Sequence, residues 1–167
     1  MGCDIHAFID YNKPGEDYVH PLSEELYLDR DYAVFSKLAN VRNYDEDIEP
    51  ISEPRGLPEK VSYIVSDENS LYISEIETNS DYCTKEDAEN WVKCGASKYT
   101  DDHKSSVTNP DYHSHPWLSV EEYEQAIKEL QTVIKYKLNV NYFAVLAAMK
   151  FLQDNGYEVR LVFWFDN

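Results

Sequence analysis

The two ends of the chain carry apolar alternations, and this pattern constrains the fold more than any other feature of the sequence. Residues 3–11 read CDIHAFIDY, and residues 157–165 read YEVRLVFWF. Every second residue is apolar in both segments, which is typical of a strand with one buried face. We expect the two strands to lie side by side, or one strand apart, inside one mixed sheet. Cys3 should then face the core, and Asp4 and His6 the opposite side.

Helical spacing of apolar residues, with capping signals at Thr84 and Ser119, predicts helices in much of the remaining chain. They are expected at about residues 31–40, 85–94, from 119 onward, and 141–154. The last is apolar almost all round its middle and should therefore be buried. VSYIV and SLYISEI predict two more strands, and residues 96–118 predict a long irregular loop.

Together these elements predict an α+β fold. We expect a single domain over residues 1–167, with a single mixed β-sheet that pairs the N- and C-terminal strands and with helices packed mainly on one face. The three cysteines, Cys3, Cys83 and Cys94, lack the CxxC spacing of metal or redox motifs. We therefore expect free thiols and a cytoplasmic location.

The strong negative charge excludes several functions. The chain has 32 acidic and 15 basic residues, a net charge of −17, so direct binding to nucleic acid or to an anionic membrane is not expected. No apolar run is long enough to span a membrane. The charge leaves three interpretations open: high solubility, a basic protein partner, or mimicry of nucleic acid in a basic groove.

Histidines and possible nucleophiles gather in two short motifs, MGCDIH and DYHSHPW. An HxH pair can place two imidazoles on one metal, with Asp4, His6 or Asp111 completing the set. This spacing is weak, so we expect neither a bound metal nor a cofactor. Cys3 and Ser114 are possible nucleophiles, but Cys3 should face the core and Ser114 lacks a glycine-flanked elbow.

The loop EPRGLP is the most informative one in the sequence. Two prolines stiffen it, and its glycine permits a positive φ or a close approach of the backbone. Arg55 is thereby held on a rigid loop, where it can grip a phosphate or carboxylate of a ligand. The alternative is a structural ion pair with one of the many carboxylates of the chain. Arg42, in VRNY, has the same two interpretations.

Four strings in the order MGCDIH, LANVRN, EPRGLP and HSHPWL resemble an uncharacterised family of short phage and bacterial proteins. The resemblance covers about half of the chain. It implies that the shared motifs include Asp4, His6, Arg42, Arg55, Gly56, His113, Ser114 and Trp117. The chain departs from the family pattern at His115 and Pro116, where a small polar pair is expected. A phage setting implies a counter-defence role, such as sequestering or degrading a nucleotide signal or blocking a defence protein.

The leading functional hypothesis is a small soluble protein that binds a phosphorylated or nucleotide-like ligand, with hydrolysis of that ligand left open. The pocket is expected to combine the polar face of the N-terminal strand with two loops. Its expected lining is Asp4, His6, Arg42, Arg55, His113, Ser114 and Trp117. Two alternatives remain: an acidic inhibitor or nucleic-acid mimic that acts on a basic partner surface, and a metal-dependent hydrolase.

Overall fold

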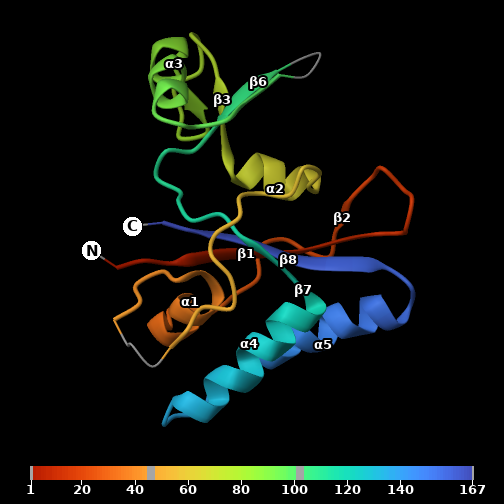
Figure 1. Ribbon diagram of the computed structural model, residues 1–167. Helices are drawn as coiled ribbons and strands as arrows, with labels where there is room; N and C mark the ends of the chain where they lie inside the picture. The colour runs from red at the N-terminus through yellow and green to blue at the C-terminus, as the bar shows by residue number, and fades with distance from the viewer. Residues whose placement is uncertain (1, 45–47, 101–103, 167) are drawn as a thin grey trace.

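The two terminal strands pair along their whole length in the computed structural model, which describes residues 2–44, 48–100 and 104–166 (Figure 1). Ile5 lies opposite Phe165, and Asn12 lies opposite Glu158. The spatial order of this first sheet is β2 (His20–Pro21), β1 (Ile5–Asn12), β8 (Glu158–Phe165) and β7 (Trp117–Ser119). The expected pairing of the terminal strands is therefore confirmed. The sheet is wholly antiparallel, however, and not mixed as expected.

A second four-stranded sheet lies beyond the first, so the expectation of a single sheet is wrong. Its spatial order is β4 (Tyr82–Cys83), β3 (Ser70–Ile73), β6 (Ser105–Thr108) and β5 (Lys98–Thr100), and α3 (Lys85–Lys93) packs beside it. Its parallel pair is β3 with β4. Strands of two to four residues are too short to show an alternation. Residues 96–118 were expected as an irregular loop, but they contain β5, β6 and the first two residues of β7.

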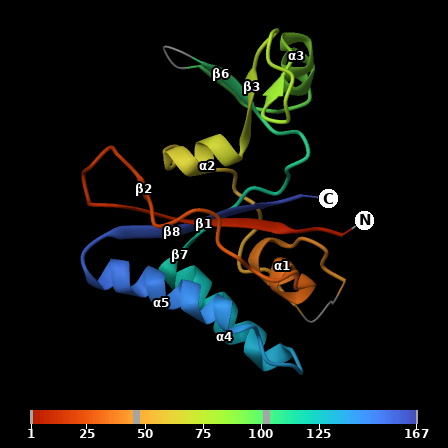
Figure 2. The same ribbon diagram turned by 180° about the vertical axis from the view of Figure 1, so that it is seen from behind.

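Three helices cover one face of the first sheet, and the main core of the protein lies between them and the sheet (Figure 2). The predicted α+β class is therefore confirmed. They are α1 (Tyr32–Ala39), α4 (Val120–Val133) and α5 (Val140–Asp154). Cys3 is buried in this core, as its place in the alternation predicts. The helix expected to be buried is α5, and it is buried only in part: Tyr142 and Met149 lie in the core, whereas Phe151 is 67% exposed.

The opposite face of the first sheet carries a smaller apolar cluster of Phe8, Val162 and Trp164. Val65 of α2 (Tyr63–Glu68) covers it. The string VSYIV was expected as a strand, but its second half begins α2, because the Ser62 hydroxyl accepts a hydrogen bond from the Val65 N–H and caps the helix. None of the helices in the described ranges combines the length and apolarity that a membrane crossing requires.

Asp10 ties this face of β1 to the start of α2. Its side chain is fully buried, and Oδ2 accepts a hydrogen bond from the Ser62 N–H at 2.9 Å. Oδ1 has no hydrogen-bond partner among the described residues. Burial raises the pKa of this carboxyl above its ordinary value of 3.8, although hydrogen bonds from Ser62 and the charge of Arg160 on β8 oppose that shift.

We expect Asp10→Asn to stabilise the fold near neutral pH by about 1 kcal/mol. A carboxyl with a raised pKa contributes its stability at low pH and loses it as the pH rises through the pKa of the folded state. Asparagine keeps an oxygen for the Ser62 N–H without the buried charge. Urea unfolding at several pH values measures the effect, and the advantage should vanish where Asp10 is protonated in both the folded and unfolded states.

Asp10→Ala is the matched control for this substitution. It also removes the charge, but it leaves the Ser62 N–H without an acceptor, so it should be less stable than Asp10→Asn at every pH. A loss of stability in Asp10→Asn near neutral pH would show instead that attraction to Arg160 outweighs the cost of burial.

Candidate functional site

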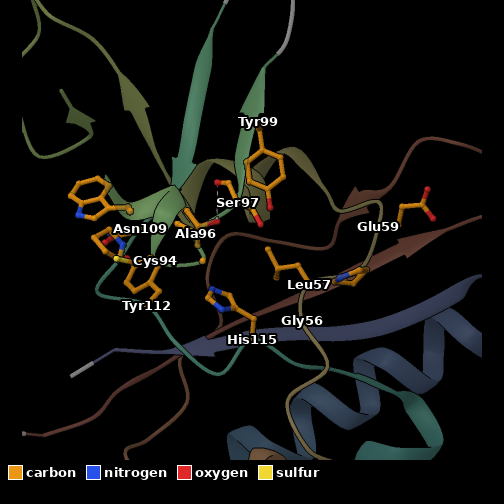
Figure 3. Close-up of a pocket in the computed structure, with 15 residues that line it drawn as sticks. Gly56, Leu57, Glu59, Cys94, Ala96, Ser97, Tyr99, Asn109, Tyr112 and His115 are labelled. Carbon is orange, nitrogen blue, oxygen red and sulfur yellow. Dashed lines mark hydrogen bonds between the residues drawn. The ribbon is translucent and has the colours of Figure 1, made fainter. Parts of the chain in front are cut away.

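A cavity of about 680 Å³ lies where α3 and the second sheet face residues 56–59 and 108–115 (Figure 3). We call it the inter-sheet pocket. Three aromatic side chains from different segments line it: Trp91 of α3, Tyr99 of β5, and Tyr112. The polar lining residues are Cys94, Ser97, Thr108, Asn109, His115 and Glu59. Glu59 is the single acidic residue, and Lys and Arg are absent, among the described lining residues.

His115 supplies a neutral imidazole to this pocket. Its Nε2 lies 2.7 Å from Oδ1 of Asn69, and its ring stacks on Trp164 with the ring centroids 6.0 Å apart. Burial, and secondarily the charge of His113, lowers the pKa of His115 to about 4. A neutral ring has one N–H, and Nε2–H donates to the Asn69 oxygen. Nδ1 is therefore an acceptor, and it has no partner among the described residues.

The loop EPRGLP shapes the pocket with its backbone and apolar residues. Gly56 has a φ of 82°, a region that favours glycine, and its N–H donates to the His115 carbonyl at 2.7 Å. Figure 3 shows the His115 ring rising between Tyr112 and Leu57. Gly56, Leu57 and Pro58 all line the cavity, so this loop holds both the backbone of His115 and the wall beside its ring.

Arg55 itself points to a different place. Its Nη2 donates to Oε1 of Glu122 at 2.8 Å, and its guanidinium carbon lies 4.8 Å from the centre of the Trp117 ring. The other oxygen of Glu122 accepts from the Ser119 N–H and completes the capping box of α4. Of the two interpretations of Arg55, these contacts match the structural ion pair.

His6 lies where both chain ends meet, on the face of β1 opposite the helical core. Its Nδ1 is 2.7 Å from Oε1 of Glu25, and its Nε2 is 3.2 Å from Oδ2 of Asp166. The ring also lies against Tyr112 and Trp164. Carboxylates only accept hydrogen bonds, so this pair favours the imidazolium with two N–H donors. The hydrogen bond to Glu25 raises the pKa of His6 most, against the opposing effect of burial.

Asp4 and Arg42 lie close to the same chain ends. Arg30 donates to both carboxylate oxygens of Asp4, and this bond holds the pKa of Asp4 below its ordinary value. The backbone N–H of Asp4 donates to Oδ1 of Asp166 at 3.0 Å. Arg42 donates to the Tyr44 hydroxyl and also interacts with the buried Cys3 thiol.

His113 and Ser114 follow Tyr112 on the same segment. The backbone of His113 exchanges two hydrogen bonds with Phe165 of β8, and its Nδ1 lies 2.9 Å from Oγ of Ser114. Ser114 has a φ of 53°. A serine beside a histidine resembles a nucleophile with its base, but such a base needs a third group to orient it. His113 Nε2 is buried and has no partner in the described part of the chain, so this pair lacks that group.

The structure therefore does not bring the seven predicted site residues into one pocket. None of them is among the described lining residues of the inter-sheet pocket. Asp4, His6 and Arg42 contact residues near the joined chain ends, His113 bridges to β8, and Arg55 stacks on Trp117. In the described ranges, no three His, Cys, Asp or Glu side chains are placed to hold one metal ion.

Sequence reasoning missed the residues that do line the pocket. Tyr112 and His115 lie in the motif DYHSHPW, whose first histidine was preferred because His115 departs from the family pattern. Trp91 and Tyr99 lie in segments without a chemical motif, and only the tertiary structure brings them to the same cavity as His115. All three cysteines are free thiols, as expected, and Cys94 is exposed at the pocket wall.

Comparison with protein-family models, curated proteins and solved structures found no match to this chain. The resemblance to short phage and bacterial proteins stays a prediction, and the functional argument depends on the geometry described above.

The two histidines that stack on Trp164 should affect stability in opposite pH ranges. His115 has a pKa lowered from 6.5 to about 4, so its neutral form stabilises the fold fully above pH 6.5 and this contribution is lost as the pH falls toward 4. His6 has a raised pKa, so its contribution is full below pH 6.5 and is lost as the pH rises through the pKa of the folded state. Unfolding free energies of His115→Gln and His6→Gln, measured across pH, test both.

Glutamine is the matched replacement at both positions, because it can donate a hydrogen bond but does not titrate. His115→Gln should remove up to about 3 kcal/mol of the pH dependence on the acid side. His6→Gln should lose most stability on the acid side and progressively less as the pH rises. Parallel profiles of both variants and the wild type would contradict the assigned environments.

Arg55→Ala should lower the free energy of unfolding by about 1 kcal/mol, because it removes the stack on Trp117 and the pair with Glu122. Arg55→Lys should recover only part of this loss, because an ammonium group lacks the flat guanidinium face. Chemical denaturation of the wild type and the two variants measures these free energies of unfolding. Equal stability of wild type and Arg55→Ala would show that these contacts contribute nothing to the fold.

Proposed function

We propose that the protein binds a small, planar, uncharged ligand of about nucleoside size in the inter-sheet pocket. The observation that carries this proposal is a cavity of about 680 Å³ that combines three aromatic side chains with a neutral histidine. Known ligand pockets have volumes of about 300–1,000 Å³ and are lined by aromatic groups with a few placed polar groups.

The charge of the lining supports an uncharged ligand over a phosphorylated one. Glu59 would repel a phosphate, and the described lining offers no Lys or Arg to offset it. Arg55, which the leading sequence hypothesis placed against the ligand, is already paired with Glu122. We therefore narrow the expected ligand from a nucleotide to a nucleoside, which lacks the phosphate. Under the family resemblance, such a protein would sequester a nucleotide-derived signal in a counter-defence role.

A second candidate function is the acidic, protein-binding inhibitor. Tyr27 and Tyr136 are 77% and 53% exposed, and the Tyr136 hydroxyl donates to Asp31. The Asp31 carboxylate therefore lies beside the Tyr136 ring. Aromatic faces beside carboxylates suit Lys and Arg side chains of a basic partner.

The exposed Cys94 offers a direct test of the pocket. Cys3 and Cys83 are buried, so alkylation of the native protein should occur at Cys94. We expect at least one of adenosine, cytidine, guanosine and uridine to slow this alkylation and to raise the melting temperature. Peptide mass spectrometry after timed iodoacetamide treatment measures the rate at each cysteine.

Tyr99→Ala should lower the affinity for the protecting nucleoside by at least about tenfold, since stacking of a base on an aromatic ring contributes about 1–3 kcal/mol to binding. Tyr27→Ala is the matched control, because it removes another exposed tyrosine that does not line the pocket. Two results would contradict the proposal: no nucleoside protects Cys94, or both variants lose protection equally.

A further inference from the structure

One side of α5 presents an apolar stripe to solvent. The helix lies beside α4 in the layer below the first sheet (Figure 2). Its exposed apolar side chains follow one another at intervals of four, three and four residues, so they share one face of the helix. They are Val140, Ala144, Ala147 and Phe151, of which Val140 is 71% exposed and Phe151 67%.

The neighbouring helix α4 shows the ordinary pattern for a face that meets water. Its exposed residues at the same intervals are polar: Glu121, Gln125, Lys128 and Thr132. Both helices pack their buried faces into the same core, so burial there does not explain the apolar residues on the outside of α5. A helix normally carries polar residues on the face away from the core. A contiguous apolar stripe on that face therefore indicates a contact surface.

The charge of α5 allows a second copy of this acidic chain to approach it. The helix contains one acidic residue, Asp154, and one basic residue, Lys150, and is therefore neutral in a chain with a net charge of −17. By contrast, α4 contains four acidic residues and one basic residue. Acidic surfaces repel one another and attract basic partners, so the neutral α5 suits a second copy better than α4 does.

The stripe is complementary to itself when two copies of α5 run antiparallel. Twofold symmetry about the middle of the stripe places Val140 of one copy level with Phe151 of the other. It also places Ala144 level with Ala147. The small central residues let the two helix backbones approach closely, and the larger residues fill the space at both ends. Intervals of four and three residues are those of the contact positions in a coiled coil.

The charges at the two ends of α5 favour the same orientation. Lys137 lies just before the N-terminus of the helix, Asp154 is its last residue, and both are exposed. A helix has a partial positive charge at its N-terminus and a partial negative charge at its C-terminus, so both residues have the unfavourable sign for their own helix. In an antiparallel pair, Lys137 of one copy lies near Asp154 of the other, and the opposite charges attract.

We propose that α5 is the contact surface of a symmetric dimer and that the α5 helix of a second copy covers the apolar stripe. The proposal is independent of the proposed ligand, because no residue of α5 is among the described lining residues of the inter-sheet pocket. One helix pair is smaller than a standard interface of about 1,600 Å², so we expect a reversible dimer with a dissociation constant above about 1 µM.

Sedimentation velocity of the full chain tests the proposal over about a hundredfold range of concentration, up to about 1 mM. We expect the mean mass to rise from that of one chain toward that of two. Ala147→Glu should raise the dissociation constant by at least about tenfold, because it places like charges beside each other near the twofold axis. Glutamate forms helices well, so α5 should stay intact, and the melting temperature checks this.

Gln125→Glu is the matched control, because it adds the same charge at an exposed position of α4. It should leave the dissociation constant unchanged. A mean mass of one chain at every concentration would overturn the proposal. Equal weakening by Ala147→Glu and Gln125→Glu would also overturn it, because net charge alone would then govern the association.

A charge reversal tests the antiparallel orientation. Lys137→Glu should weaken the dimer, because it faces Asp154 of the second copy with a like charge. Adding Asp154→Lys to this variant should restore the dimer, because the two residues again have opposite charges. Failure of the double variant to recover the affinity would overturn the antiparallel pairing and the symmetric dimer with it.

Discussion

The pairing of β1 with β8 is the interaction on which the rest of the structure depends. It joins the two ends of the chain through eight residue pairs and gives the sheet two different faces. One face carries Ile5, Ala7 and Ile9 into the main helical core. The other carries Phe8 and Trp164, and it holds α2 and the segment around Tyr112. Because antiparallel pairing fixes the register, this one contact decides which face each side chain of β1 and β8 occupies.

Trp164 shows how local surroundings give similar side chains different properties. Its ring lies against His6 on one strand and His115 on a separate segment. Two carboxylates flank His6 and favour its charged form, whereas burial beside a neutral amide keeps His115 uncharged. His6 ties the meeting point of the chain ends together through two carboxylates, and the neutral His115 offers a hydrogen-bond acceptor to the pocket. Their roles differ because the groups around them differ, not because their sequence motifs do.

The inter-sheet pocket is assembled from segments far apart in the chain: residues 56–59, 91–99 and 108–115. In a chain with a net charge of −17, this cavity has a single acidic side chain in its described lining. Arg55, for which the sequence left a ligand contact and a structural ion pair open, pairs with Glu122 and fixes the loop against α4. The backbone of the loop therefore shapes the pocket. The charge of Arg55 holds the loop against α4 and does not face the pocket.

The sequence by itself determined the terminal strands, which side of β1 Cys3 and His6 face, and the helix starts at Thr84 and Ser119. These features depend on the period of apolar residues and on hydrogen bonds between near neighbours, which are local properties. It did not determine the second sheet or the contacts of Arg55. Short strands gain stability only from their partners, and an ion pair depends on which carboxylate folding brings near. Only the tertiary structure therefore placed Trp91, Tyr99 and His115 around one cavity.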